Sequence, residues 1–161
     1  MPAVDEVRAR ILPFLQSIGL EVVIAAVPAG TLLPGIAIRR GVLHCDPHCL
    51  TWPGDLLHEA GHLAVTPAAL RTAVDGDALS DAPHAGEAEA TAWAYAATRA
   101  LGLDPSVLFH AGGYHGKGGQ LAFTYAGGCY PGAGGLIAAD MCDPPNAPAG
   151  GYPHMRRWLR E

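Results

Sequence analysis

The chain has 161 residues, of which 50% are apolar, and its formal net charge is −5 at pH 7. This length and composition predict one domain over residues 1–161 with a buried core. One lysine and nine arginines against an acidic excess argue against a nucleic-acid partner. No run of about 18 apolar residues is present, so we expect no membrane span.

The first 27 residues predict a helix and then a strand. Apolar residues recur at helical spacing over residues 4–18, with Pro13 as a kink or break and Gly19 as a cap. Residues 21–27 are nearly all apolar, which favours a mostly buried strand. Charged residues come before any long apolar run, so we expect no secretory signal peptide and a cytoplasmic protein.

Residues 36–45 predict two short strands around a turn at Arg40 and Gly41. A loop containing Pro47 follows, and two histidines and two cysteines gather around it. They would suit a second zinc site or a redox pair, but no further tight pair completes the pattern. We therefore expect free thiols in a reducing cytoplasm at all four cysteines, which are Cys45, Cys49, Cys129 and Cys142.

Residues 58–62 read His-Glu-Ala-Gly-His, an H-E-x-x-H motif. On a helix, His58 and His62 project from one face about a turn apart, and two neutral imidazoles at this spacing can bind one Zn²⁺ ion. Glu59 lies between them around the helix, where it can act as general base towards a water that the metal activates. Two histidines and a carboxylate also suit Fe(II), but the helical H-E-x-x-H pattern favours zinc.

The residues around the motif predict the helix that it needs. Pro53 and Asp55 are start signals, with Asp55 as the candidate N-cap, and Pro67 ends the run. Gly61 is a poor helix former. A glycine beside two ligands therefore indicates close packing against another backbone.

A catalytic zinc ion usually takes a third protein ligand. The longer motif H-E-x-x-H-x-x-G-x-x-H supplies a third histidine soon after the first two. It is excluded here, because Val65 and Ala68 stand where it needs Gly and His. An alanine-rich helix predicted over residues 85–101 offers Glu87 and Glu89 instead. These two side chains point about 200° apart, so one helix face cannot present both, and periodicity alone does not choose between them.

The segment from Glu87 to Ala94 resembles the E-x-E-A-N-x-F-A signature of the ImmA/IrrE family of zincin-type metallopeptidases. Thr91 replaces the usual Asn or Asp, and Trp93 replaces the usual Phe. The resemblance covers roughly residues 36–101. It implies that Glu87 is the third zinc ligand, beside the two motif histidines. His84, three residues before Glu87, is expected to be a surface histidine.

The same resemblance implies an α+β, zincin-like metallopeptidase domain. Its parts would be a small mixed or antiparallel sheet, the H-E-x-x-H helix and a following helix with the third ligand. In such domains an edge strand just ahead of the metal helix can bind an extended peptide by adding a strand. The implied substrate is a protein or peptide, such as a regulatory protein supplied by another chain.

Residues 111–135 hold ten glycines and predict a long loop that borders the active site, apart from a strand at residues 121–125. Before it, Asp104 and Pro105 predict the start of a short helix. Within the loop, Tyr114 and His115 are candidate stabilisers of a transition-state oxyanion. The sequence gives no P-loop Lys-Ser/Thr pair, so we expect no nucleotide cofactor.

The sequence thus predicts a zinc metallopeptidase with Zn²⁺ as its cofactor. Zinc is held by His58, His62 and Glu87, and Glu59 is the general base. One alternative is a non-catalytic zinc-binding sensor or regulatory module, although metal binding alone would not need Glu59. Another is a metal-free scaffold with both histidines buried and hydrogen-bonded in the core.

Overall fold

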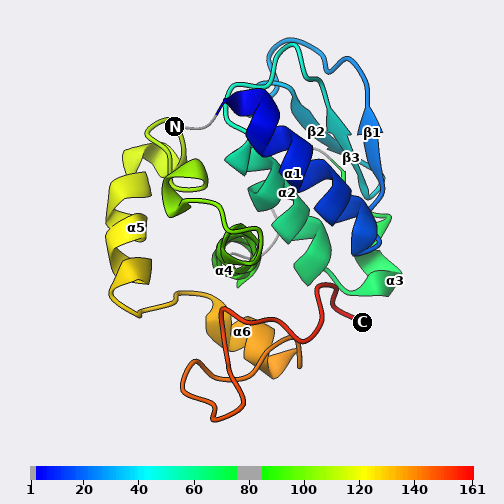
Figure 1. Ribbon diagram of the computed structural model, residues 1–161. Helices are drawn as coiled ribbons and strands as arrows, with labels where there is room; N and C mark the ends of the chain where they lie inside the picture. Colours follow the sequence, from blue (N-terminus) through cyan, green and yellow to red (C-terminus); the bar gives the residue numbers. More distant parts are fainter. Residues whose placement is uncertain (1–2, 76–84) are drawn as a thin grey trace.

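Helix α2 lies at the centre of the molecule, between a small sheet and helix α4, with α1 packed alongside (Figure 1). The computed structural model describes residues 3–75 and 85–161. The described elements, in chain order, are α1 (Val4–Ser17), β1 (Val22–Ile24), β2 (Ile36–Arg39), β3 (Val42–Cys45), α2 (Gly54–Val65), α3 (Ala68–Arg71), α4 (Ala85–Ala100), the 3₁₀ turns η2 (Pro105–Val107) and η3 (Tyr114–Gly116), α5 (Gly118–Ala126) and α6 (Ala133–Ala138). The fold is therefore α+β, as predicted. None of the described helices combines the length and apolar character needed to cross a bilayer.

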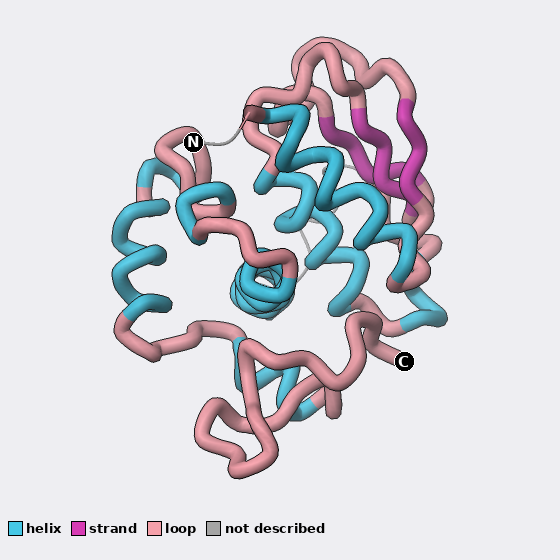
Figure 2. The backbone as a smooth tube through the Cα atoms, viewed as in Figure 1, coloured by secondary structure: helices cyan, strands magenta, loops and turns pink. Residues whose placement is uncertain are grey.

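The sheet has three strands in the order β1-β3-β2 (Figure 2). β1 pairs with β3 in parallel, and β2 pairs with β3 antiparallel. The predicted hairpin is confirmed: Arg40 and Gly41 both have positive φ, as a tight two-residue hairpin turn requires. The expected edge strand just ahead of the motif helix is not found, because β3, the strand that precedes α2, is the central strand of the sheet. The free edges in the described part of the sheet belong to β1 and β2.

Helix α1 runs unbroken through Pro13, so the predicted break does not occur. Pro13 lies on the exposed face, where water can reach the carbonyl group that the missing N–H leaves free. Gly19 follows the helix with φ 96° and donates its N–H to the carbonyl of Gln16, which confirms it as the cap. β1 is shorter than predicted and its Ile24 is 55% exposed, since edge strands are covered on fewer sides.

Helices α2 and α4 cross at a very short distance. A Cβ atom at Gly61 would lie 2.6 Å from the carbonyl oxygen of Ala90, so only glycine allows this approach. On α4, small side chains at Ala90, Ala94 and Ala97 are fully buried. The predicted contact of Gly61 with another backbone is confirmed, and it brings the motif helix against the helix that carries Glu87.

The Gly-rich segment is not the predicted loop with one strand. Helices α5 and α6 form there instead, and residues 121–125 lie inside α5. Tyr125 is buried and Leu121 is partly buried one turn before it, whereas Phe123 is 81% exposed. These apolar residues therefore follow a helical period, which an alternating strand pattern conceals over five residues. The short helix predicted after Asp104 forms as η2, with the Asp104 side chain accepting from the N–H of Ser106.

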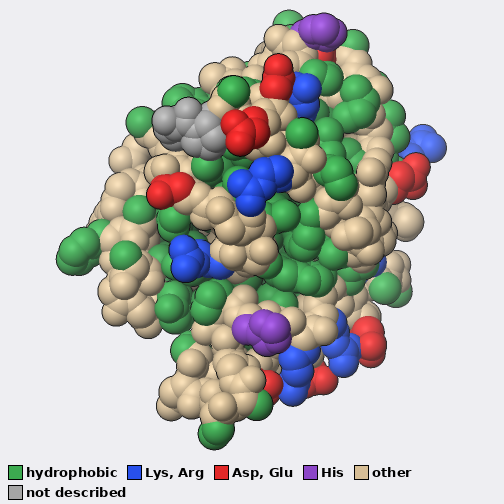
Figure 3. All heavy atoms as spheres, in the orientation of Figure 1, with side chains coloured by type: hydrophobic (Ala, Val, Ile, Leu, Met, Phe, Trp, Pro, Cys, Tyr) green, Lys and Arg blue, Asp and Glu red, His purple; other side chains and the backbone are tan. Residues whose placement is uncertain are grey.

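The last residues of the chain return to the end of α2. The N–H of Arg160 donates to the carbonyl of Ala64, and Trp93 of α4 donates its indole N–H to the carbonyl of Trp158. Each arginine near this end of the chain pairs with a carboxylate: Arg156 with Asp140 and Asp143, Arg157 with Asp140 and Glu161, and Arg160 with Glu89. Figure 3 shows charged side chains of both signs interspersed on this face.

Candidate metal centre

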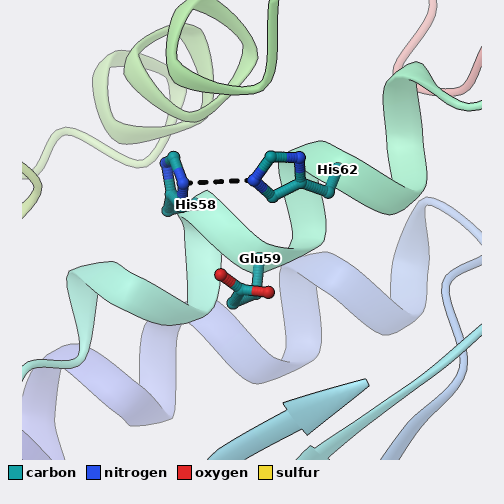
Figure 4. Close-up of side chains that lie close together, drawn as sticks. All are labelled: His58, Glu59 and His62. Carbon is teal, nitrogen blue, oxygen red and sulfur yellow. Dashed lines mark hydrogen bonds between the residues drawn. The ribbon is translucent and has the colours of Figure 1, made fainter. Parts of the chain in front are cut away.

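His58 and His62 point the same way from α2, and their Nε2 atoms lie 3.2 Å apart. In Figure 4 the two rings face one another along one side of the helix, as the four-residue spacing requires. Their ring centroids lie 4.9 Å apart with the planes nearly perpendicular. Both side chains are nearly buried, with 12% and 11% exposed.

The carboxylate of Glu87 meets both imidazoles from the second helix. Its Oε1 lies 3.1 Å from Nε2 of His58, and its Oε2 lies 3.2 Å from Nε2 of His62. Glu89 turns the other way, where its Oε2 accepts from the guanidinium of Arg160 at 2.7 Å. The structure therefore brings Glu87, and not Glu89, to the two motif histidines.

These three groups fit a zinc ion by the spacing of their donor atoms. Zinc holds nitrogen and oxygen ligands at about 2.0–2.1 Å in a tetrahedral arrangement, which separates neighbouring donor atoms by about 3.3 Å. The measured separations of 3.1–3.2 Å are close to this value. Two imidazole nitrogens and a carboxylate are also the donor types that catalytic zinc sites use.

Glu59 occupies a different side of α2. Its carboxylate points away from the line between the two imidazoles (Figure 4), although one oxygen lies within 4.8 Å of a ring nitrogen of each histidine. Glu59 could itself complete a group of three ligands at that distance. Glu87 is the better third ligand, because its oxygens lie closer and meet both Nε2 atoms. This leaves Glu59 beside the centre and outside the closer set of three donor groups.

Burial and charge shift the pKa values of these groups in opposite directions. Burial raises the pKa of Glu59, and the neighbouring imidazoles His58 and His62 only partly oppose this. The hydrogen bonds from His58 and His62 lower the pKa of Glu87 strongly. Burial alone would lower the pKa of His58, but its hydrogen bond to Glu87 and the nearby carboxylates outweigh burial and raise it. Glu87 is thus held as an anion, while Glu59 takes up a proton more readily than an ordinary glutamate.

The centre is open on the α4 side. The side chain of Glu87 is 63% exposed, in contrast to the two nearly buried imidazoles. Solvent therefore reaches the carboxylate side of the centre, while the histidines are held in the protein interior.

The two candidate oxyanion stabilisers lie in different surroundings. Tyr114 is partly buried, and its hydroxyl lies 3.2 Å from Nδ1 of His58, the ring nitrogen opposite the one that faces Glu87. Burial raises the pKa of Tyr114 well above its usual range. His115 is exposed on the same turn. At this position Tyr114 is better placed to orient His58 than to contact a substrate.

A buried pair that sequence reasoning did not identify lies one turn before Glu59. Asp55 does not cap α2; its Oδ1 lies 2.8 Å from Nε2 of His110, and both side chains are almost fully buried. Trp52 stacks on the His110 ring with centroids 4.4 Å apart. Burial raises the pKa of Asp55 against the opposing effect of His110. No short sequence pattern links these residues, because 55 positions separate Asp55 from His110.

The second metal site considered for the cysteine-containing loop does not form among the described residues. Within residues 3–75 and 85–161, no group of three or more potential ligand side chains gathers at this loop. The four cysteines are free, with Cys45 and Cys142 buried and Cys49 and Cys129 exposed. His84 lies outside the described residues.

Comparisons with known proteins add no relative: no protein-family model, no curated protein and no solved structure matches this chain.

Proposed function

We propose that this protein is a zinc-dependent hydrolase of peptide bonds on a zincin-like domain. The observation that carries the proposal is the meeting of the Glu87 carboxylate, from α4, with the Nε2 atoms of His58 and His62, from α2. These three side chains would hold the metal, and Glu59 lies beside them, with one oxygen within 4.8 Å of a ring nitrogen of each histidine.

Each residue then has a separate chemical role. When bound, zinc supplies Lewis acidity, which lowers the pKa of a nearby water molecule to about 7 and polarises a carbonyl group. Glu59 accepts the proton that the water gives up and returns it to the leaving amine. The raised pKa of Glu59 supports this role, because a general base works best when its pKa approaches the working pH.

The open side of the centre supports a peptide or protein substrate. Glu87 is largely exposed, so a chain can approach from that side. The resemblance of residues 87–94 to the ImmA/IrrE signature favours a protein over a small amide. The four free cysteines support a reducing compartment such as the cytoplasm as the place of action.

The test compares the wild type with Glu59→Gln, which removes the base but keeps the size of the side chain. Elemental analysis gives the zinc content of each purified chain. Each is then incubated with a mixture of unfolded proteins in heavy-oxygen water, and mass spectrometry finds new chain ends. We expect about one zinc per chain in both proteins. Heavy oxygen should enter new carboxyl ends with the wild type, about 10²–10⁴-fold faster than with Glu59→Gln.

The exposed residue Glu21 provides the matched control, because Glu21→Gln makes the same chemical change away from the centre. It should behave as the wild type. Zinc in the wild type without any new chain ends would reject the hydrolase and leave a zinc-binding sensor module. A wild type that takes up no zinc would reject the metal centre itself.

A further inference from the structure

The turn at Tyr114 brings a phenol to the far side of His58. The Tyr114 hydroxyl lies 3.2 Å from Nδ1 of His58, and the two rings meet edge to face with centroids 5.3 Å apart. The opposite ring nitrogen, Nε2, faces Glu87 and His62. Tyr114 thus contacts the one polar atom of His58 that a metal at this centre would leave free.

The backbone at this turn is strained. Tyr114 and His115 have φ values of 54° and 52°, and neither is a glycine. Consecutive residues in this left-handed region persist only where the surrounding structure enforces them, and such strain gathers at functional sites.

Contacts on both sides of the turn hold this conformation. Upstream, His110 is anchored to Asp55 of α2 at 2.8 Å. Downstream, the N–H of Lys117 donates to the carbonyl of Tyr114 at 3.0 Å. The ring of Phe109 packs against the ring of Tyr114, with centroids 5.5 Å apart. These contacts therefore fix the position of Tyr114 beside His58.

The contact with Tyr114 matches the tautomer of His58 that a metal at this centre requires. A metal bound at Nε2 of His58 leaves the ring proton on Nδ1. From there it is donated to the hydroxyl oxygen of Tyr114, 3.2 Å away.

We propose that Tyr114 is a positioning residue that fixes the tautomer and orientation of His58 for metal binding. This inference rests on the proposed zinc centre. Hydrogen bonds to the second nitrogen of a metal-binding imidazole orient the ring and strengthen its bond to the metal.

The test measures zinc affinity by competition with a coloured chelator, on the full chain and with zinc alone as the probe. Tyr114→Phe should raise the Kd for zinc about 10–100-fold. It should also shift the visible absorption bands of the Co²⁺-loaded protein, because the ligand field that His58 imposes on the metal changes.

The matched control is Tyr152→Phe. Tyr152 is buried, and its hydroxyl also donates to α4, at the carbonyl of Ala92 and 2.8 Å away, but it does not contact His58. Its loss should leave the Kd for zinc unchanged. Wild-type affinity in Tyr114→Phe would overturn the inference, as would an equal loss of affinity in Tyr152→Phe. A wild type that binds no zinc is the distinct result that rejects the centre and this inference together.

Discussion

The α2–α4 pair and the Gly-rich segment 111–135 both use glycine for close contact, but their helices have different origins. A Cβ atom at Gly61 would lie 2.6 Å from the backbone of Ala90, and one at Gly132 would lie 2.0 Å from the backbone of Ala88. In the first pair, α4 is rich in alanine and α2 has helical apolar spacing behind clear start signals, so both helices are expected from local sequence. The helices of the second segment are rich in glycine, so they depend on packing against the rest of the protein.

The proposed metal centre lies in the region whose helices the local sequence predicts best. The two motif histidines and Glu87 lie on α2 and α4. The Gly-rich segment contributes the turn with Tyr114 at the back of the centre. Substitution of a ligand in the first region should therefore affect metal binding directly, whereas most substitutions in the second region, Tyr114 excepted, should affect the stability of its packing.

The largest effect should separate the two glutamates of α4. Glu87→Ala removes a group that meets both imidazoles, so zinc affinity should fall by more than the roughly 10–100-fold typical of outer-shell changes. Glu89→Ala should keep the zinc. It should lower the free energy of unfolding by about 1–2 kcal/mol, because Arg160 loses its charged partner. Zinc content and urea unfolding measure both effects, and a loss of zinc in Glu89→Ala would contradict the assignment.

An intermediate effect is expected where α2 and α4 touch. Gly61→Ala improves helix propensity but places a methyl group against the carbonyl of Ala90. Because neither backbone can move freely, overpacking should dominate and lower the free energy of unfolding by about 1–3 kcal/mol. Zinc binding should weaken as well, since the helices that carry the ligands are forced apart. A variant at least as stable as the wild type in urea would show that this crossing is looser than described.

The smallest effect tests neighbouring glycines of α5. A Cβ atom at Gly119 would meet nothing within 4 Å, so Gly119→Ala should raise the free energy of unfolding by about 0.5 kcal/mol. At Gly118 the added Cβ would lie 2.6 Å from the carbonyl of His110, and Gly118→Ala should destabilise by about 1–3 kcal/mol. Urea unfolding of the two variants should give opposite signs. Equal effects would mean that α5 is not held against the His110 turn.

Local sequence determined much of the fold and the core of the candidate site. Helical spacing and the five-residue motif predicted α2, and the alanine run predicted α4 almost to its ends. The Arg40–Gly41 turn predicted the hairpin, because positive φ is a local requirement. These features could be predicted since they depend on neighbours within a few positions.

The tertiary structure alone decided what depends on distant residues. Periodicity could not choose between Glu87 and Glu89, because the choice is set by which face of α4 meets α2 and which meets Arg160. It could not show the Asp55–His110 pair or the contact of Tyr114 with His58, which join segments more than 50 positions apart. It also gave no sign of α5 and α6, since glycine-rich helices form only where packing offsets their conformational entropy. Local propensities set the elements that carry the ligands, and long-range packing set which side chains meet.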